Sequence, residues 1–155
     1  MKLSELIKNI SVKKIIGSTD VDILDLKCDS NYVAKGSLYI CICGTIQDGH
    51  DFVTQAEKYG AAAIITEREV DCSLPQIIVE NTRKAIGKIA SAFYNNPCEK
   101  LRFIAVTGTN GKTSTTHLIA SILQNNGVKC ALVGTLGIYY DGKFVDSGLT
   151  TPDPL

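Results

Sequence analysis

The stretch 106–113, VTGTNGKT, decides which fold the C-terminal part of this chain is expected to adopt. An apolar run, 102–107 (RFIAVT), precedes it and predicts a strand, and an amphipathic segment, 114–127, follows it and predicts a helix. A glycine-rich loop between a strand and a helix suits phosphate, because backbone N–H groups and the helix N-terminus face the anion. The stretch therefore predicts a nucleotide-binding loop.

The loop has the compact form G-x-x-G-K-T, because Val106 stands where the longer eight-residue form requires glycine. In this form Lys112 pairs with the terminal phosphates and Thr113 ligates magnesium. The alternative is an ordinary glycine turn in which Thr113 or Ser114 caps the helix. A lysine at a helix N-terminus opposes the helix dipole unless an anion is bound, which favours the phosphate loop.

The composition is that of a globular protein: 155 residues, 45% hydrophobic and 21% charged. Sixteen basic and sixteen acidic residues cancel, so we expect neither nucleic acid nor a membrane as partner. No apolar run reaches the roughly 18 residues of a membrane span, and charges interrupt the N-terminus, which predicts a cytoplasmic protein. The six cysteines form no CxxC pair and are expected to be small buried hydrophobes, although a reactive or metal-binding thiol remains an alternative.

Residues 1–98 predict a complete small α/β domain. Asn81 is expected to cap a helix with an apolar stripe, and Gly60 to end a helix that Asp48 or Asp51 caps. The remaining expected elements are a helix at 3–10 and strands at 21–26, 36–43, 61–66 and 76–80. The segment 95–101 contains Asn-Asn-Pro and is the predicted boundary to a second domain, 99–155.

The second domain is expected to begin as a doubly wound, nucleotide-binding α/β domain. After the loop, Leu118, Ile119, Ile122 and Leu123 are predicted to face a sheet, a strand follows at 129–134, and Asp141-Gly142 turns a hairpin. A doubly wound domain needs several more strands, so we expect the chain to be the N-terminal portion of a longer protein.

The segment 105–123, AVTGTNGKTSTTHLIASIL, resembles the nucleotide loop of the Mur ligase and folylpolyglutamate synthase superfamily, which joins amino acids to carboxylates with ATP. The segment 28–65 is similar to the uridine-nucleotide-binding domain of the Mur ligases that add the third amino acid or the peptide after it. GTNGKT and the later TTPDP resemble the ligases that add the third. Asn31, Lys35 and Leu149 depart from the common arginine, proline and asparagine.

The resemblance implies an ATP- and Mg²⁺-dependent amide ligase that activates its substrate as an acyl phosphate. The implied small-molecule substrates are ATP, UDP-N-acetylmuramoyl-L-alanyl-D-glutamate and a diamino acid, meso-diaminopimelate or L-lysine, and a monomer is expected. The implied ATP-binding residues are Gly108, Thr109, Asn110, Gly111, Lys112, Thr113 and Ser114, with Lys112 catalytic and Thr113 on magnesium. The implied contacts of the UDP substrate are Cys28, Ser30, Thr45, Ile46, Gln47, Thr150 and Thr151.

Structural explanations exist for several of these residues. Ser30 can serve as a turn hydroxyl, Asp48 and His50 as turn and cap residues, and Thr150-Thr151 as a helix cap. His117 is expected to be a surface or packing residue rather than a base. For the whole protein the alternatives are the fourth Mur ligase, a folylpolyglutamate-type synthetase, or a non-catalytic nucleotide-binding fragment.

Overall fold

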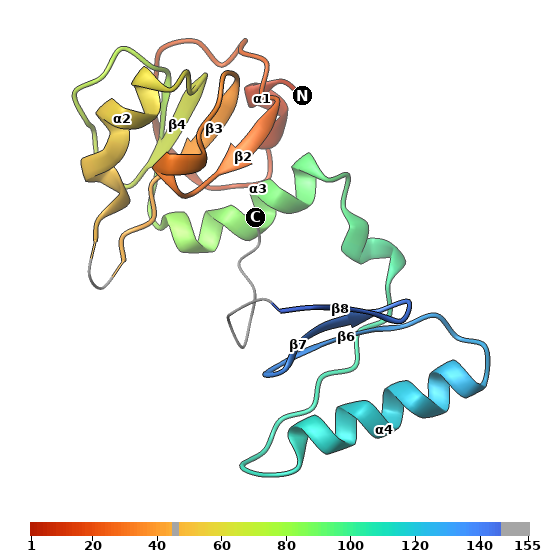
Figure 1. Ribbon diagram of the computed structural model, residues 1–155. Helices are drawn as coiled ribbons and strands as arrows, with labels where there is room; N and C mark the ends of the chain where they lie inside the picture. Colours follow the sequence, from red (N-terminus) through yellow and green to blue (C-terminus); the bar gives the residue numbers. More distant parts are fainter. Residues whose placement is uncertain (45–46, 147–155) are drawn as a thin grey trace. The chain divides into compact units, whose positions relative to one another are not determined.

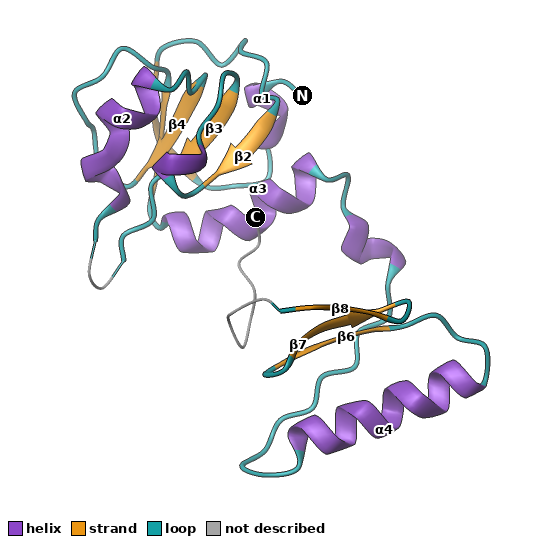
Figure 2. Ribbon diagram, in the orientation of Figure 1, coloured by secondary structure: helices purple, strands orange, loops and turns teal. Residues whose placement is uncertain are grey.

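The computed structural model describes residues 1–44 and 47–146, and these fall into two compact units, Met1–Leu101 and a second unit that begins at Arg102. Figure 1 labels the elements along the chain and Figure 2 colours them by type. The first unit contains α1 (Leu3–Leu6), β1 (Val12–Ile16), β2 (Asp25–Lys27), η1 (Ser30–Tyr32), β3 (Ser37–Ile40), η2 (Gly49–Phe52), α2 (Val53–Lys58), β4 (Ala63–Thr66), β5 (Gln76–Val79), α3 (Thr82–Phe93) and η3 (Pro97–Lys100). The second contains α4 (Lys112–Asn125), β6 (Ala131–Gly134), β7 (Gly137–Tyr140) and β8 (Lys143–Val145).

The first unit is built on a five-stranded sheet in the order β1-β5-β4-β3-β2. Strands β2 to β5 run parallel, and β1 pairs antiparallel with β5 at one edge. Helices lie on both sides of the sheet, with α2 on one face and α1 and α3 on the other (Figure 1). The predicted α/β class is confirmed.

The core follows from the alternation of side chains along the central strands. Leu38, Ile40 and Ile65 point to the face that α1 and α3 cover. Tyr39 and Ile64, from the same strands, point to the face that α2 covers. Because both faces are covered, the strands are apolar almost throughout, as in other parallel sheets.

Helix α3 forms as its sequence predicts. The Asn81 side chain accepts a hydrogen bond from the Lys84 amide at 2.8 Å, and the inward stripe is buried against the sheet. Asn95 and Asn96 then take positive φ values of 63° and 50°, which turn the chain out of the helix. Gly60 ends α2 at φ 93°, as predicted.

Three features of the first unit differ from expectation. Helix α1 ends at Leu6, well before Ile10, and the strand expected from Val21 begins only at Asp25. Strand β1 was not predicted, because its sequence VKKII has exposed lysines at its centre and no regular alternation. Such a charged pattern is typical of an edge strand.

The second unit contains one long helix and a three-stranded antiparallel sheet, β6-β7-β8. The predicted hairpin is confirmed: β7 pairs with β8, and Asp141 and Gly142 turn it at φ 50° and 71°. Both values lie in the left-handed region that this type of two-residue turn requires.

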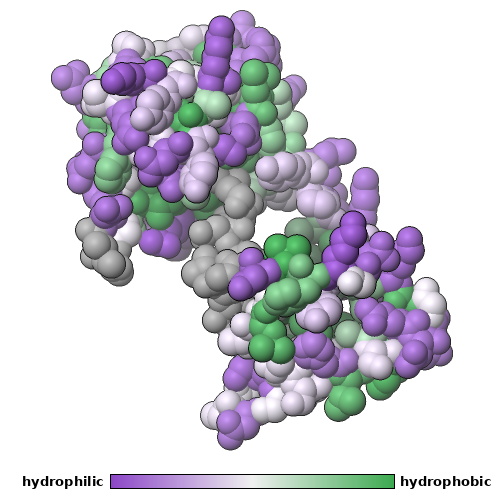
Figure 3. Space-filling model, in the orientation of Figure 1, coloured by the Kyte–Doolittle hydropathy of each residue, from purple (hydrophilic) through white to green (hydrophobic). Residues whose placement is uncertain are grey.

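The strand predicted at 102–107 is wrong, because this segment is not assigned to a strand and none of the strands described pairs with it. Strand β6, the expected parallel neighbour, instead pairs antiparallel with β7. Leu118 and Ile122 do not face a sheet either, since they are 65% and 62% exposed. The reason is that one helix and a three-stranded sheet cover only one side of each other, and Figure 3 shows hydrophobic side chains on the surface of this unit.

The cysteines form no disulfide in the described residues. Only Cys41 is fully buried, while Cys43 and Cys98 are exposed, so the expectation of six buried thiols is wrong for most of them. Burial raises the pKa of the Cys41 thiol to about 12, which makes it a small hydrophobe in practice.

Candidate functional site

The predicted phosphate loop precedes α4, and the side chain of Lys112 contacts the backbone of this loop. Lys112 is the first residue of the helix, and its Nζ donates to the carbonyl oxygens of Gly108 at 2.7 Å and Thr109 at 3.4 Å. Gly111, immediately before the helix, has φ 77°, a conformation that favours glycine. The lysine therefore lies across the loop, within reach of any anion bound there.

The N-terminus of α4 has room and unused donors for an anion. Gly111 is its N-cap and supplies no side-chain hydrogen bond, so the alternative in which Thr113 or Ser114 caps the helix is wrong. The first amide groups of a helix lack intrahelical acceptors. A Cβ built on Gly111 would meet no atom within 4 Å, which means that the backbone is open to close approach by a ligand.

Thr113 is half-buried in the first turn of α4, and its Oγ1 lies 3.4 Å from Oγ1 of Thr135, just after β6. A threonine hydroxyl beside the loop lysine is a ligand type that Mg²⁺ accepts. No group of three or more His, Cys, Asp or Glu side chains that could hold a metal gathers among the residues described, so the candidate magnesium ligand rests on Thr113 and the loop sequence. The loop therefore fits the chemistry of a magnesium nucleotide.

A second candidate site is a cavity of about 290 Å³ in the first unit. It brings together three residues predicted to contact the UDP substrate, Cys28, Ser30 and Gln47. Thr45, Ile46, Thr150 and Thr151, predicted for the same substrate, lie outside the described residues. The other residues that line the cavity are Asp29, Asn31, Tyr39, Ile42, Gly49 and Phe52.

Ser30 is fixed at this cavity by a chain of hydrogen bonds. It is 5% exposed, and its hydroxyl donates to Oε1 of Gln55 at 3.2 Å. Gln55 donates in turn to Oδ1 of Asn31 at 3.2 Å, and the Asn31 side chain donates to Asp29 at 3.0 Å. Asn31, which stands where the resemblance expects arginine, thus orders the wall of the cavity.

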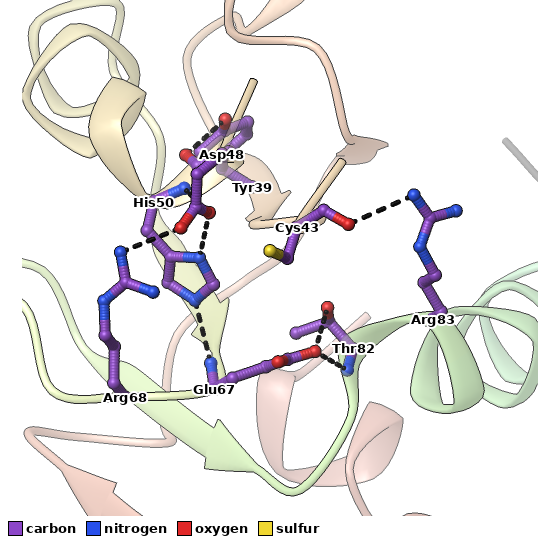
Figure 4. Close-up of polar contacts among 9 residues, drawn as sticks. Tyr39, Cys43, Asp48, His50, Glu67, Arg68, Thr82 and Arg83 are labelled. Atoms are coloured by element: carbon purple, nitrogen blue, oxygen red, sulfur yellow. Dashed lines mark hydrogen bonds and ion pairs between the residues drawn. The ribbon is translucent and has the colours of Figure 1, made fainter. Parts of the chain in front are cut away.

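Asp48 and His50 lie beside the cavity and form turn and cap contacts. The expected cap of α2 by Asp48 or Asp51 is wrong, because Phe52 is the N-cap of α2 and no side chain caps it. Asp48 caps η2, because its Oδ1 accepts from the His50 amide at 3.0 Å. The same oxygen lies 2.6 Å from Nδ1 of His50, and Oδ2 accepts from Arg68 at 2.9 Å (Figure 4). The hydrogen bonds from His50, and then the one from Arg68, lower the pKa of Asp48.

Residues that the sequence did not single out complete this polar cluster. The Glu67 amide donates to Nε2 of His50 at 3.0 Å, and its carboxylate accepts from the amide and hydroxyl of Thr82 at 2.8 and 2.9 Å (Figure 4). Arg83 donates to the Cys43 carbonyl oxygen at 3.1 Å. The partners are distant in sequence, and only the parallel order of the strands brings them together.

His117 packs, as expected. Its ring contacts Tyr139 edge-on, with centroids 6.0 Å apart, and its Nε2 is buried without a hydrogen-bond partner. Neither feature resembles the poised environment of a general base.

No helix in the described part of the chain combines the length and apolarity that a membrane span requires.

Two family models match the chain. Residues 23–94 match the model described as Mur ligase family, catalytic domain, and residues 106–155 match the Mur ligase middle domain. The first match includes the cavity and the polar cluster, and the second includes the 108–114 loop. Together they leave out residues 1–22 and 95–105.

Two curated relatives are similar over most of the chain. A UDP-N-acetylmuramoyl-L-alanyl-D-glutamate--2,6-diaminopimelate ligase of Bacillus licheniformis is 42% identical over 99% of this chain. The enzyme of the same name from Aquifex aeolicus is 50% identical over 82% of it. The chain covers 32% and 26% of these relatives, so it spans about a third or less of their length.

Solved structures share the fold. The structure of a UDP-N-acetylmuramoyl-L-alanyl-D-glutamate--2,6-diaminopimelate ligase aligns over 99% of this chain and 31% of its own, with a TM-score of 0.78 at 24% identity. MurF from Acinetobacter baumannii aligns over 74% of this chain and 24% of its own, with a TM-score of 0.55 at 32% identity.

Proposed function

Because the chain belongs to the Mur ligase family, we propose that it forms the part of an ATP-dependent amide ligase that holds ATP and UDP-N-acetylmuramoyl-L-alanyl-D-glutamate while 2,6-diaminopimelate is added. The observation that carries this proposal is the 108–114 loop, with Lys112 lying across it at the N-terminus of α4. The names of the most similar relatives support the choice of substrate and amino acid.

In this proposal the 108–114 loop binds the phosphates of ATP. Lys112 exchanges its two carbonyl contacts for the β- and γ-phosphates, and the amides of the first turn of α4 donate to phosphate oxygens. Thr113 provides an oxygen ligand for Mg²⁺, which neutralises charge on the phosphates when bound. The remaining members of the site, Thr109, Asn110 and Ser114, shape the same loop.

The proposed reaction has two steps. An oxygen of the substrate carboxylate attacks the γ-phosphorus of ATP, and ADP leaves, so that an acyl phosphate is formed. The amine of the diamino acid then attacks the acyl carbon, loses a proton and expels phosphate, which leaves an amide bond. Lys112 contributes by holding charge that spreads over the transferred phosphoryl group.

The cavity of the first unit is the proposed place for the uridine nucleotide. Ser30 and Gln47 present polar side chains and Cys28 a thiol at its wall, which suits a ligand with a flat base and several hydroxyls. Thr45, Ile46, Thr150 and Thr151 are proposed as further contacts. We also propose a monomer in the cytoplasm.

The test uses the gene product that carries this chain, assayed for ADP formation that depends on both the UDP-muramoyl-dipeptide and diaminopimelate. We expect Lys112→Ala to lower this rate at least about a hundredfold, the order seen when one transition-state donor is removed. The control Lys129→Ala removes an exposed lysine outside the loop and should change the rate less than about twofold.

The acceptor decides between relatives. Turnover with the muramoyl-tripeptide and D-alanyl-D-alanine in place of diaminopimelate would instead support the activity named for a similar D-alanyl-D-alanyl ligase from Acinetobacter baumannii. A wild-type protein that turns over neither pair would refute the proposed function.

A further inference from the structure

The segment that carries Gln47 is a closed loop, which we call the Gln47 loop (residues 42–44 and 47–49). Its base is tied by backbone contacts: Cys43 and Asp48 form an antiparallel bridge, the Gly44 amide donates to the Gln47 carbonyl oxygen at 2.9 Å, and the Gly49 amide donates to the Ile42 carbonyl oxygen at 2.9 Å. Because Ile42, Gln47 and Gly49 line the cavity, the position of this base sets the shape of the proposed UDP site.

His50 connects the base of the Gln47 loop to the end of β4. The residue is 5% exposed, with Nδ1 2.6 Å from Asp48 and Nε2 3.0 Å from the Glu67 amide nitrogen (Figure 4). The Glu67 amide can only donate, so Nε2 must accept and the proton must reside on Nδ1. The contacts thus select one neutral tautomer, in which His50 donates to Asp48 and accepts from Glu67.

Both ends of this connection are anchored on other elements. Asp48 is also held by Arg68 at 2.9 Å, and the Glu67 carboxylate is bound to Thr82 at the start of α3. On the opposite side of the loop, Arg83 from α3 donates to the Cys43 carbonyl oxygen. The Gln47 loop is therefore held by contacts with α3 and with the residues after β4, in addition to its own backbone hydrogen bonds.

We propose that His50, through Asp48 and Glu67, is a positioning residue that holds the Gln47 loop in the geometry that binds the uridine nucleotide. This inference rests on the proposed function, since it assumes that the cavity binds a UDP-sugar. An apolar side chain could fill the same volume, but it would leave Asp48 and the Glu67 amide without their present partner.

The experiment measures the affinity of the full chain for UDP-N-acetylglucosamine. We expect His50→Ala to weaken binding about fivefold to tenfold, the scale of one lost buried hydrogen bond. His50→Gln, whose amide oxygen can accept from Glu67, should recover part of this loss. Affinity for ATP, which the other unit is proposed to bind, should stay within about twofold, and unchanged amide signals of β4 and β5 serve as the control for folding of the first unit.

The pair of His50 variants separates positioning from mere packing, because glutamine restores an acceptor for the Glu67 amide and alanine does not. His117→Gln replaces the other histidine of the sequence and is the matched control, which should bind the UDP-sugar within about twofold of the wild type. An equal loss of affinity in His50→Ala and His50→Gln would overturn the inference.

A ligand-free measurement distinguishes failure of this inference from failure of the proposed function. Amide hydrogen exchange at Gly44 and Gly49 reports directly on the loop base, and should be about tenfold faster in His50→Ala. If the wild type does not bind the UDP-sugar, the proposed substrate is wrong. If it binds, but His50→Ala changes neither affinity nor exchange, the proposed substrate stands and the role of His50 is refuted.

Discussion

Replacing Glu67 by glutamine should destabilise the first unit by about 2–3 kcal/mol at neutral pH. The Glu67 carboxylate accepts two hydrogen bonds from Thr82, at 2.8 and 2.9 Å, in the first turn of α3. A bond to a charged acceptor stabilises by about 1.5–3 kcal/mol and a neutral one by about 0.5–1.5, so losing the charge costs about 1 kcal/mol for each bond. The favourable interaction with the helix dipole adds about 0.3–1 kcal/mol.

The assay is urea unfolding followed through amide signals of β4 and β5, which report on the first unit alone. Glu69→Gln is the matched control, because Glu69 is 61% exposed and pairs only with the exposed Lys14. A surface pair of this kind contributes about 0–1 kcal/mol. We therefore expect Glu67→Gln to lower the unfolding free energy clearly more than Glu69→Gln, although the two substitutions are chemically identical and lie two positions apart.

The effect should also depend on pH with a defined sign. The hydrogen bonds from Thr82, the amide first, lower the pKa of Glu67 below its ordinary value of 4.5. A carboxylate with a depressed folded-state pKa stabilises the fold above its unfolded pKa, and this contribution is lost as the pH falls through the folded value. The difference in unfolding free energy between the wild type and Glu67→Gln should be largest at neutral pH and decrease below about pH 4.5. A difference that stays constant from neutral pH to about pH 3, or an equal loss in Glu69→Gln, would refute this account of the contact.

Two further predictions concern backbone and thiol positions in the first unit. Gly60→Ala should lower stability by about 1–3 kcal/mol in the same urea assay, because Gly60 has φ 93° and a Cβ would lie 3.1 Å from the Lys35 Cα. Gly87→Ala lies inside α3, where an added Cβ would meet no atom within 4 Å, and should instead raise stability by about 0.5–1 kcal/mol. A change in stability of the same sign for both substitutions would contradict the backbone explanation. Iodoacetamide at neutral pH should modify the exposed Cys43 in the folded chain and leave Cys41 unmodified until urea is added, as measured by mass spectrometry. The reason is that Cys41 is buried and its pKa is raised to about 12. Labelling of Cys41 without urea would show that this part of the sheet opens readily.

Local signals in the sequence were sufficient where the structure is local. Asn81 caps α3, Gly60 ends α2 and Asp141-Gly142 turns the β7–β8 hairpin, because each depends on residues within a few positions. The proposed phosphate loop is also a local prediction, since its lysine, glycines and threonine are adjacent in sequence. For the same reason the resemblance to a family could be recognised from short stretches.

Non-local features were missed or misjudged. Strand β1 is defined by its pairing with β5. The polar cluster around His50 depends on Glu67, Arg68 and Thr82, none of which has a distinctive neighbour in sequence. The apolar run 102–107 was taken for a strand because hydrophobicity alone cannot supply the neighbouring strand that defines one.

The position of β1 also shapes the order in which the first unit can assemble during synthesis. The strand is synthesised before β2, β3 and β4, whereas β5, its neighbour in the described sheet, is synthesised after them. Val12–Ile16 therefore lacks this strand partner until β5 has been synthesised. We expect its two central lysines to oppose association of this unpaired segment with other nascent chains, so that the charge on this edge acts before the sheet is complete as well as afterwards.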